Sequence, residues 1–99
     1  MKAADDTRIM TLTICNQRGL HARAAAKFVK CAGQFRAEIT VARDGTRVSG
    51  QSIMGLMMLA AGLGSEIEIS ASGPDSEQAL AAIRALVECG FEEGAAEAR

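Results

Sequence analysis

Four segments of the chain alternate apolar and polar residues, which is the pattern of β-strands that bury one face and expose the other. These segments are residues 10–14, 38–41, 46–48 and 66–70. The Asp44-Gly45 pair between the second and third segments is typical of a tight turn and predicts a β-hairpin. We therefore expect four short strands, each with one face in water.

Three further segments space their apolar residues as amphipathic helices do. The first helix is expected from about His21 to Cys31, with Gly33 as its stop. The second follows the hairpin and is expected to end at Gly62 or Gly64.

The third helix carries start and stop signals of its own. Asp75 followed three residues later by Gln78 resembles a capping box, and Gly90 followed by Phe91 fits a Schellman ending. The element order is therefore β-α-β-β-α-β-α.

Because every strand has one polar face, all helices must cover the other face. This predicts an α+β fold in which three helices cover one side of a four-stranded antiparallel sheet. Within it we assign residues 1–8 to a polar N-terminal extension, 9–91 to the domain, and 92–99 to a flexible tail.

Length and charge restrict the class of protein. The 99 residues suffice for one domain, and 11 basic against 12 acidic residues give a net charge of -1. Nucleic acid and anionic membranes attract proteins with a basic excess, so neither is an expected partner. No apolar run approaches the ~20 residues that span a bilayer, and we expect a cytoplasmic monomer.

Three cysteines, Cys15, Cys31 and Cys89, form an odd set without a CxxC pair. This is unlike a disulfide framework or a zinc site. We interpret them as reduced core thiols and expect no metal and no cofactor.

The candidate chemistry lies at the start of the first helix. His21 is the chain's one histidine. The backbone amides of Ala22, Arg23 and Ala24 should be unpaired there, and the helix dipole makes this end an anion site. Arg23 could neutralise phosphoryl oxygens. The alternative is a polar residue at a helix start beside an unrelated arginine.

The segment Gly19-Leu20-His21-Ala22-Arg23, followed by Ala25-Ala26-Lys27-Phe28-Val29, resembles the active-site signature of HPr proteins. These are histidine phosphocarriers of the bacterial phosphotransferase system. Ser49 to Met57 resembles the family's second signature, and the resemblance covers about residues 9–91.

The resemblance implies an open-faced β-sandwich fold and a phosphocarrier function. In the family, enzyme I phosphorylates the histidine on Nδ1 from phosphoenolpyruvate, and the phosphoryl group then moves to an enzyme IIA. His21 and Arg23 inherit these roles by position. The family usually has proline where this chain has Ala24. Alanine also forms a first helical turn and leaves one more N–H for phosphate.

Ser52 has two interpretations. A serine before a helical run is a common N-cap. The resemblance adds regulation, because HPr kinase/phosphorylase modifies this position in many members; Gln51 stands where many kinase substrates carry lysine.

The second helix is too apolar for one buried stripe. If Leu56, Leu59 and Ala60 face the core, then Ile53, Met54 and Met57 point outward and suit a surface that binds several partners. A basic rim, Arg23, Lys27 and Lys30, shares one face of the first helix. We expect a partner surface from Leu20, Lys27, Lys30, Ile53, Met54 and Met57. The alternative places the methionines in the core and the lysines on a solvated face.

Two other functions compete with a phosphocarrier. A small phosphatase of acylphosphatase size could use Asn16, Arg18 and Arg23, but this explains neither His21 nor the second motif. A regulatory binding module could act through the second helix, with Ser52 as its switch. Among carriers, Ala24 and Gln51 favour the nitrogen-related regulatory branch slightly over sugar uptake.

Overall fold

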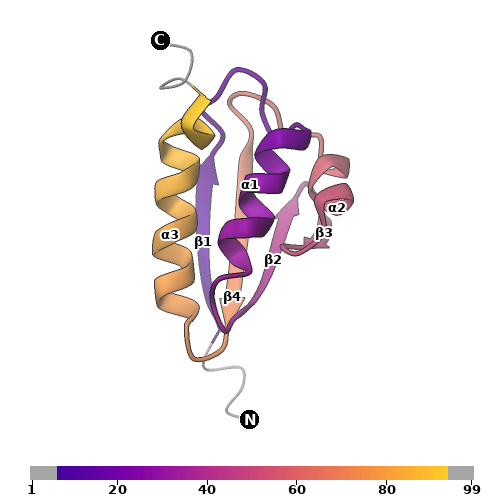
Figure 1. The fold of residues 1–99 in the computed structure, drawn as a ribbon. Coiled ribbons are helices and arrows are strands. Elements are labelled where there is room, and N and C mark those ends of the chain that lie inside the picture. The colour runs from indigo at the N-terminus through magenta and orange to yellow at the C-terminus, as the bar shows by residue number, and fades with distance from the viewer. Residues whose placement is uncertain (1–6, 94–99) are drawn as a thin grey trace.

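The computed structural model describes residues 7–93, in which four strands form one antiparallel sheet in the order β1-β4-β2-β3 (Figure 1). The strands are β1 (Arg8–Thr13), β2 (Glu38–Arg43), β3 (Thr46–Ser49) and β4 (Glu66–Ser72). Leu12 lies opposite Ile67 in the β1–β4 pair, and Val41 lies opposite Ile69 in the β2–β4 pair. These four side chains are buried, so the alternation in the sequence marks the core face correctly.

Three helices cover that face: α1 (Ala22–Ala32), α2 (Ile53–Met58) and α3 (Ser76–Glu88). Figure 1 shows α1 between α3 and the shorter α2, all on the same side of the sheet. Fully buried Phe28 and Phe91 are among the largest core side chains. The predicted α+β open-faced sandwich is confirmed, and no helix within residues 7–93 has the length and apolar character needed to cross a bilayer.

The chain ends lie partly outside the described residues. Of the predicted N-terminal extension, residues 1–6 are outside, and Arg8 belongs to β1. Residues 94–99 of the expected flexible tail are also outside. Glu92 and Glu93, which that tail was expected to include, are placed by the structure: Glu92 ends a 3-10 helix, Gly90–Glu92, and Glu93 follows it.

The predicted end of the second helix is wrong. The helix α2 stops at Met58 with Leu59 as its C-cap, ahead of Gly62 and Gly64. The break comes from Ala60, whose φ of 52° is left-handed and cannot continue a helix.

The predicted capping box of the third helix is also wrong. Asp75 is the N-cap of α3, but its side chain makes no cap hydrogen bond. Its Oδ2 instead accepts a 2.8 Å hydrogen bond from the backbone N–H of Arg36, and its own N–H donates to the Arg36 carbonyl at 3.1 Å. Asp75 therefore joins the start of α3 to the segment before β2. The predicted left-handed ending at Gly90 is present, with a φ of 67°.

The cysteines are free thiols, but they are not all in the core. Cys15 and Cys89 are exposed, and Cys31 is half-buried. Cys15 follows the end of β1 at an outward position, and Cys89 is the C-cap of α3, so neither shares the buried face of its neighbours.

Candidate functional site

The loop between β1 and α1 determines where His21 lies. Gly19 has a φ of 64°, and a Cβ on it would lie 2.4 Å from the carbonyl oxygen of Ala61. Glycine is therefore required by both conformation and space. The next residue, Leu20, donates a 2.9 Å backbone hydrogen bond to that same oxygen and is buried. This clamp presents His21 at the start of α1.

His21 is the N-cap residue of α1, with extended backbone angles. Its carbonyl oxygen accepts the first helical hydrogen bond, from the N–H of Ala25 at 2.8 Å. The amides of Ala22, Arg23 and Ala24 precede that bond and have no helical acceptor. The first turn also lacks an acidic residue, so no side chain of that turn opposes the positive end of the dipole. The arrangement suits an anion.

The imidazole of His21 contacts a carboxylate from the far end of the chain. Its Nε2 is hydrogen-bonded to Oε2 of Glu93, and the side chain of Asn16 donates from Nδ2 to Oε1 of the same carboxylate at 3.1 Å. The side chains of His21 and Glu93 are 24% and 11% exposed. The site is therefore a half-buried polar cluster, and the histidine is held at one nitrogen.

Opposing effects act on the Glu93 carboxyl group. Burial by itself raises its pKa, but hydrogen bonds from His21 and Asn16, with the charges of His21 and Arg18, outweigh burial and hold the pKa below its usual range. Glu93 is therefore an anion at neutral pH and a fixed negative charge beside the imidazole.

A shallow cavity of about 220 Å³ opens beside His21. It is lined by Arg18, Leu20, His21, Ala60, Ala61 and Gly62. The arginine in this lining is Arg18, whereas Arg23 is exposed on the first turn of α1. Both guanidinium groups belong to segments that flank the histidine, so phosphoryl oxygens could be approached from the loop and from the helix.

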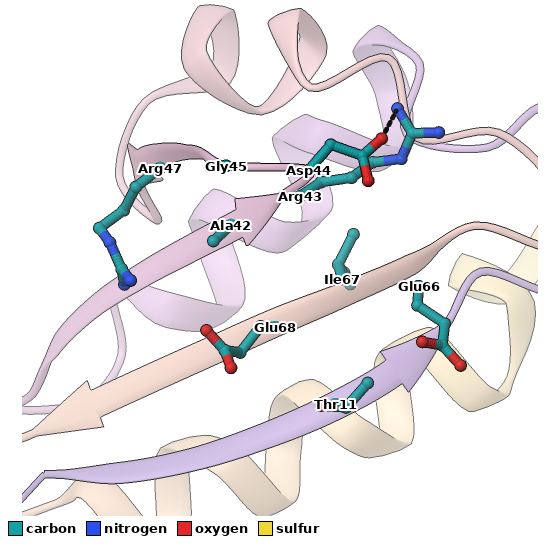
Figure 2. A pocket seen from close by; sticks show the side chains of 9 residues that line it. All are labelled: Thr11, Ala42, Arg43, Asp44, Gly45, Arg47, Glu66, Ile67 and Glu68. Carbon is teal, nitrogen blue, oxygen red and sulfur yellow. Dashed lines mark ion pairs between the residues drawn. The ribbon is translucent and has the colours of Figure 1, made fainter.

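A larger concavity of about 430 Å³ lies on the uncovered face of the sheet, and His21 is not among its lining residues (Figure 2). It is lined by Thr11, Ala42, Arg43, Asp44, Gly45, Arg47, Glu66, Ile67 and Glu68, with Arg43 and Asp44 3.8 Å apart as an ion pair. Its lining includes no histidine or cysteine nucleophile, so the larger of these two cavities is not the candidate phosphorylation site. Within residues 7–93 no three His, Cys, Asp or Glu side chains gather as a metal site.

Ser52 is the N-cap of α2, as predicted. Its Oγ accepts a 2.9 Å hydrogen bond from the N–H of Gly55. The hydroxyl oxygen thus already caps α2. After phosphorylation of this oxygen, a phosphate oxygen would have to accept the hydrogen bond from Gly55 in its place.

The apolar surface expected on α2 is exposed. Met54 is 69% exposed, and Ile53 and Met57 are also exposed, while Leu56 and Leu59 are buried. The alternative in which these methionines are core residues is therefore wrong. Met58, which the helical pattern did not single out, is 75% exposed and extends the surface.

Two members of the expected surface, Leu20 and Lys27, and one expected core residue, Ala60, need correction. Leu20 is buried and offers little area to a partner. Ala60 is exposed rather than in the core, because its left-handed backbone takes it out of the helix. Lys27 is half-buried: its Nζ donates to the Phe91 carbonyl at 2.8 Å and lies 3.6 Å from Glu92 Oε1. Lys27 therefore faces the C-terminal turn, while Arg23 and Lys30 remain exposed.

Sequence reasoning missed Glu93 and gave Asn16 a different role. Asn16 and Glu93 are 77 positions apart, and no local periodicity reports such a contact. One signal was present: an aromatic residue, Phe91, directly after the left-handed Gly90 implies that the chain continues to pack beyond α3.

Comparison with known proteins gives one consistent result. A family model described as "PTS HPr component phosphorylation site" matches residues 10–89. The phosphocarrier protein HPr of Cupriavidus necator is 48% identical over 82 residues, which are 83% of this chain and 92% of that protein. The phosphocarrier protein NPr of Shewanella violacea is 46% identical, with 83% and 90% covered. A crystal structure of HPr-C-His from Thermoanaerobacter tengcongensis superimposes with a TM-score of 0.83 at 42% identity, covering 87% of this chain and 97% of that one.

Proposed function

Because the chain belongs to the HPr family of phosphocarrier proteins, we propose that His21 accepts a phosphoryl group from phosphorylated enzyme I and passes it to an enzyme IIA. Its relatives are phosphocarriers, so the chain is a carrier within a phosphotransferase relay and not an enzyme. In this proposal the protein transfers the phosphoryl group in the cytoplasm.

One observation carries this assignment: the chain's single histidine is the N-cap of α1, beside three backbone amides that have no helical acceptor. A phosphoryl group on Nδ1 would add its negative charge at the positive end of the helix. The dipole contributes only about 0.3–1 kcal/mol at such exposure. This stabilises the phosphorylated form without preventing transfer to the next protein.

The residues around His21 have matching roles in the proposal. The amides of Ala22, Arg23 and Ala24 donate to phosphoryl oxygens, and the Arg23 guanidinium neutralises their charge as the donor leaves. Ala24 is fully buried, so its methyl group belongs to the core while its N–H remains at the helix start. Alanine in place of the family's proline therefore keeps a backbone N–H at this position without adding exposed surface.

We also propose that α2 is the partner surface, with Ile53, Met54, Met57 and Met58 as its apolar centre. A kinase that phosphorylates Ser52 would add about -1.5 to -2 charges at the edge of this surface. The neutral Gln51 beside Ser52, together with Ala24, favours the nitrogen-related branch of the system over sugar uptake.

A regulatory module that acts through α2 without phosphotransfer is the second candidate, and the exposed methionines favour it. The phosphatase candidate has lost one of its three residues: Asn16, which would have to activate water, donates to Gly19 and Glu93 instead.

The test is to incubate the purified chain with enzyme I paralogues, phosphoenolpyruvate and candidate enzyme IIA proteins, and to follow the phosphate. We expect one acid-labile phosphate per chain that passes to one class of IIA. His21→Ala should take none and remain folded. Acid-labile phosphate on that variant would contradict the assignment, and tight α2-dependent binding without transfer would favour the regulatory module.

A further inference from the structure

The far end of the chain reaches the proposed phosphorylation site through Glu93. The carboxylate of Glu93 contacts Nε2 of His21 across 72 positions of sequence. Within residues 7–93, His21 makes no other side-chain hydrogen bond, so Nδ1 carries no partner. A neutral imidazole has one nitrogen with a proton and one with a lone pair, and the partner of one nitrogen determines the role of the other.

We propose that Glu93 is a positioning residue that directs phosphorylation to Nδ1 of His21 by occupying Nε2. A carboxylate can only accept, so Nε2 must donate its proton. The lone pair is thereby assigned to Nδ1, on the residue that is the N-cap of α1. This inference rests on the proposed phosphocarrier function and adds a residue to it.

Glu93 is itself held in place by Asn16. The amide nitrogen of Asn16 donates to the Gly19 carbonyl at 2.9 Å and to Glu93 Oε1 at 3.1 Å, which uses both of its protons. Turned over, the amide would place its oxygen against these two acceptors. Its Oδ1 is the one buried side-chain polar atom within residues 7–93 that has no hydrogen-bond partner. The amide orientation that leaves this oxygen unpaired is the one that holds the Glu93 carboxylate in place.

The segment that carries Glu93 is anchored at two further points. Phe91 is fully buried, and its carbonyl oxygen accepts from Lys27 of α1 at 2.8 Å. The contact between His21 and Glu93 is therefore supported by the packed Phe91 two positions earlier and by the hydrogen bond from Asn16.

The same contact stabilises the phosphorylated ring. In the transfer step the Nδ1 lone pair forms the bond to phosphorus, and the bond from phosphorus to the donor's leaving atom breaks and takes its electron pair with it. Nε2 keeps its proton, so the ring becomes a cation as it is phosphorylated. The negative charge of Glu93 lies directly beside that cation.

The test uses phosphoramidate, a small donor that needs no partner protein. Its phosphorus–nitrogen bond breaks as Nδ1 is phosphorylated, and the nitrogen leaves as ammonia after protonation by water. Because the chain has one histidine, nitrogen and phosphorus NMR report which ring nitrogen carries the phosphate. We expect phosphate on Nδ1 alone in the wild type and on both nitrogens in Glu93→Ala. Loss of a hydrogen bond to a charged group corresponds to about a 10- to 100-fold loss of preference.

A second readout follows the proton itself. In the wild type the Nε2 proton should give a downfield resonance protected from solvent, and Glu93→Ala should lose it. Glu93→Gln keeps the size and should show the same changes to a smaller degree. Glu92→Ala is the matched control: Glu92 is 67% exposed and pairs only with Lys27 among the described residues. It should leave both readouts unchanged.

The outcomes separate the two levels of inference. A wild-type chain that takes no acid-labile phosphate on His21 would overturn the proposed function. Wild type and Glu93→Ala both phosphorylated on Nδ1 alone, with the Nε2 proton equally protected, would overturn the positioning role and leave the phosphocarrier function intact.

Discussion

The ammonium group of Lys27 donates a 2.8 Å hydrogen bond to the carbonyl oxygen of Phe91 and so ties the middle of α1 to the turn that follows α3. The same ammonium lies 3.6 Å from Glu92. Phe91 has a φ of 55°, so its carbonyl points in a direction that an ordinary helix would not give. A residue that its sequence position assigns to a basic rim is thus a structural anchor for the segment that reaches His21.

Lys27→Met should loosen this anchor. The substitution keeps the length of the apolar stem but removes the donor, so we expect a loss of about 0.5–1.5 kcal/mol in the free energy of unfolding. Amide hydrogen exchange in residues 90–93 should be faster. The measurements are urea denaturation and exchange by mass spectrometry. Lys30→Met is the matched control, because Lys30 is exposed on the same helix face. Equal effects of the two substitutions would contradict the anchor.

The sequence predicts the sheet and the helices that cover it because each strand has one apolar face for the core and one polar face for water. In β4, Ile67 and Ile69 point inward while Glu66 and Glu68 point outward. This local alternation is enough to predict the strand and its buried face. The position of His21 is also predictable, since a polar residue before a helical run marks a helix start. The end of α2 is not: Ala60 is an ordinary helix former, and only its tertiary setting gives it a left-handed backbone.

The rest of the site depends on contacts between distant parts of the chain. Glu93 follows a helix stop and lies in a segment of polar pattern, so local patterns place it outside the domain. Its role depends on where Asn16 and His21 lie after folding, 77 and 72 positions away. The side chain of Asp75 likewise leaves its own helix for the Arg36 amide. Propensity predicts which residues can cap or bind, and tertiary structure decides which partner they take.

The stability of the protein should depend on pH through Glu93. Its pKa is lowered in the folded state, because the hydrogen bonds and positive charges around it outweigh burial. A group with a lowered folded pKa stabilises the protein above its unfolded pKa and loses this effect as the pH falls through the folded value. Wild type should therefore be more stable than Glu93→Gln at neutral pH, and the difference should shrink below the usual glutamate range. Urea denaturation across acidic pH checks this, and a difference that stays constant would contradict it.

Ser52 permits a comparison that separates its cap from its charge. Asn and Asp are both good N-cap residues, so Ser52→Asn and Ser52→Asp should each preserve the bond to Gly55 and fold normally. Ser52→Asp places a negative charge beside Met54 and should slow transfer from enzyme I by about tenfold, as expected for like-charge repulsion of an acidic partner. Ser52→Ala should cost about 0.5–2 kcal/mol of stability. Equal transfer rates for the Asp and Asn variants would leave Ser52 as a structural cap only.

The exposed surface of α2 and the exposed Lys30 of α1 should affect different steps of partner binding. Met54→Ala removes an exposed apolar side chain, so stability should change by less than about 0.5 kcal/mol while the complex with enzyme I dissociates faster. Lys30→Glu reverses an exposed charge and should slow association and flatten its dependence on salt, because screening acts on long-range attraction.

Two control substitutions make the same chemical changes on β1 and α3, away from α2. Ile9→Ala removes an exposed apolar side chain from β1, and Arg84→Glu reverses an exposed charge on α3. If α2 and the adjacent end of α1 form the partner surface, neither control changes binding kinetics, because neither site adjoins His21 or α2. If Arg84→Glu slowed association as much as Lys30→Glu does, the attraction would come from the overall charge of the chain rather than from a local patch. Since the net charge is -1, only a local concentration of positive charge can attract an acidic partner, and the salt dependence of the two variants decides where it lies.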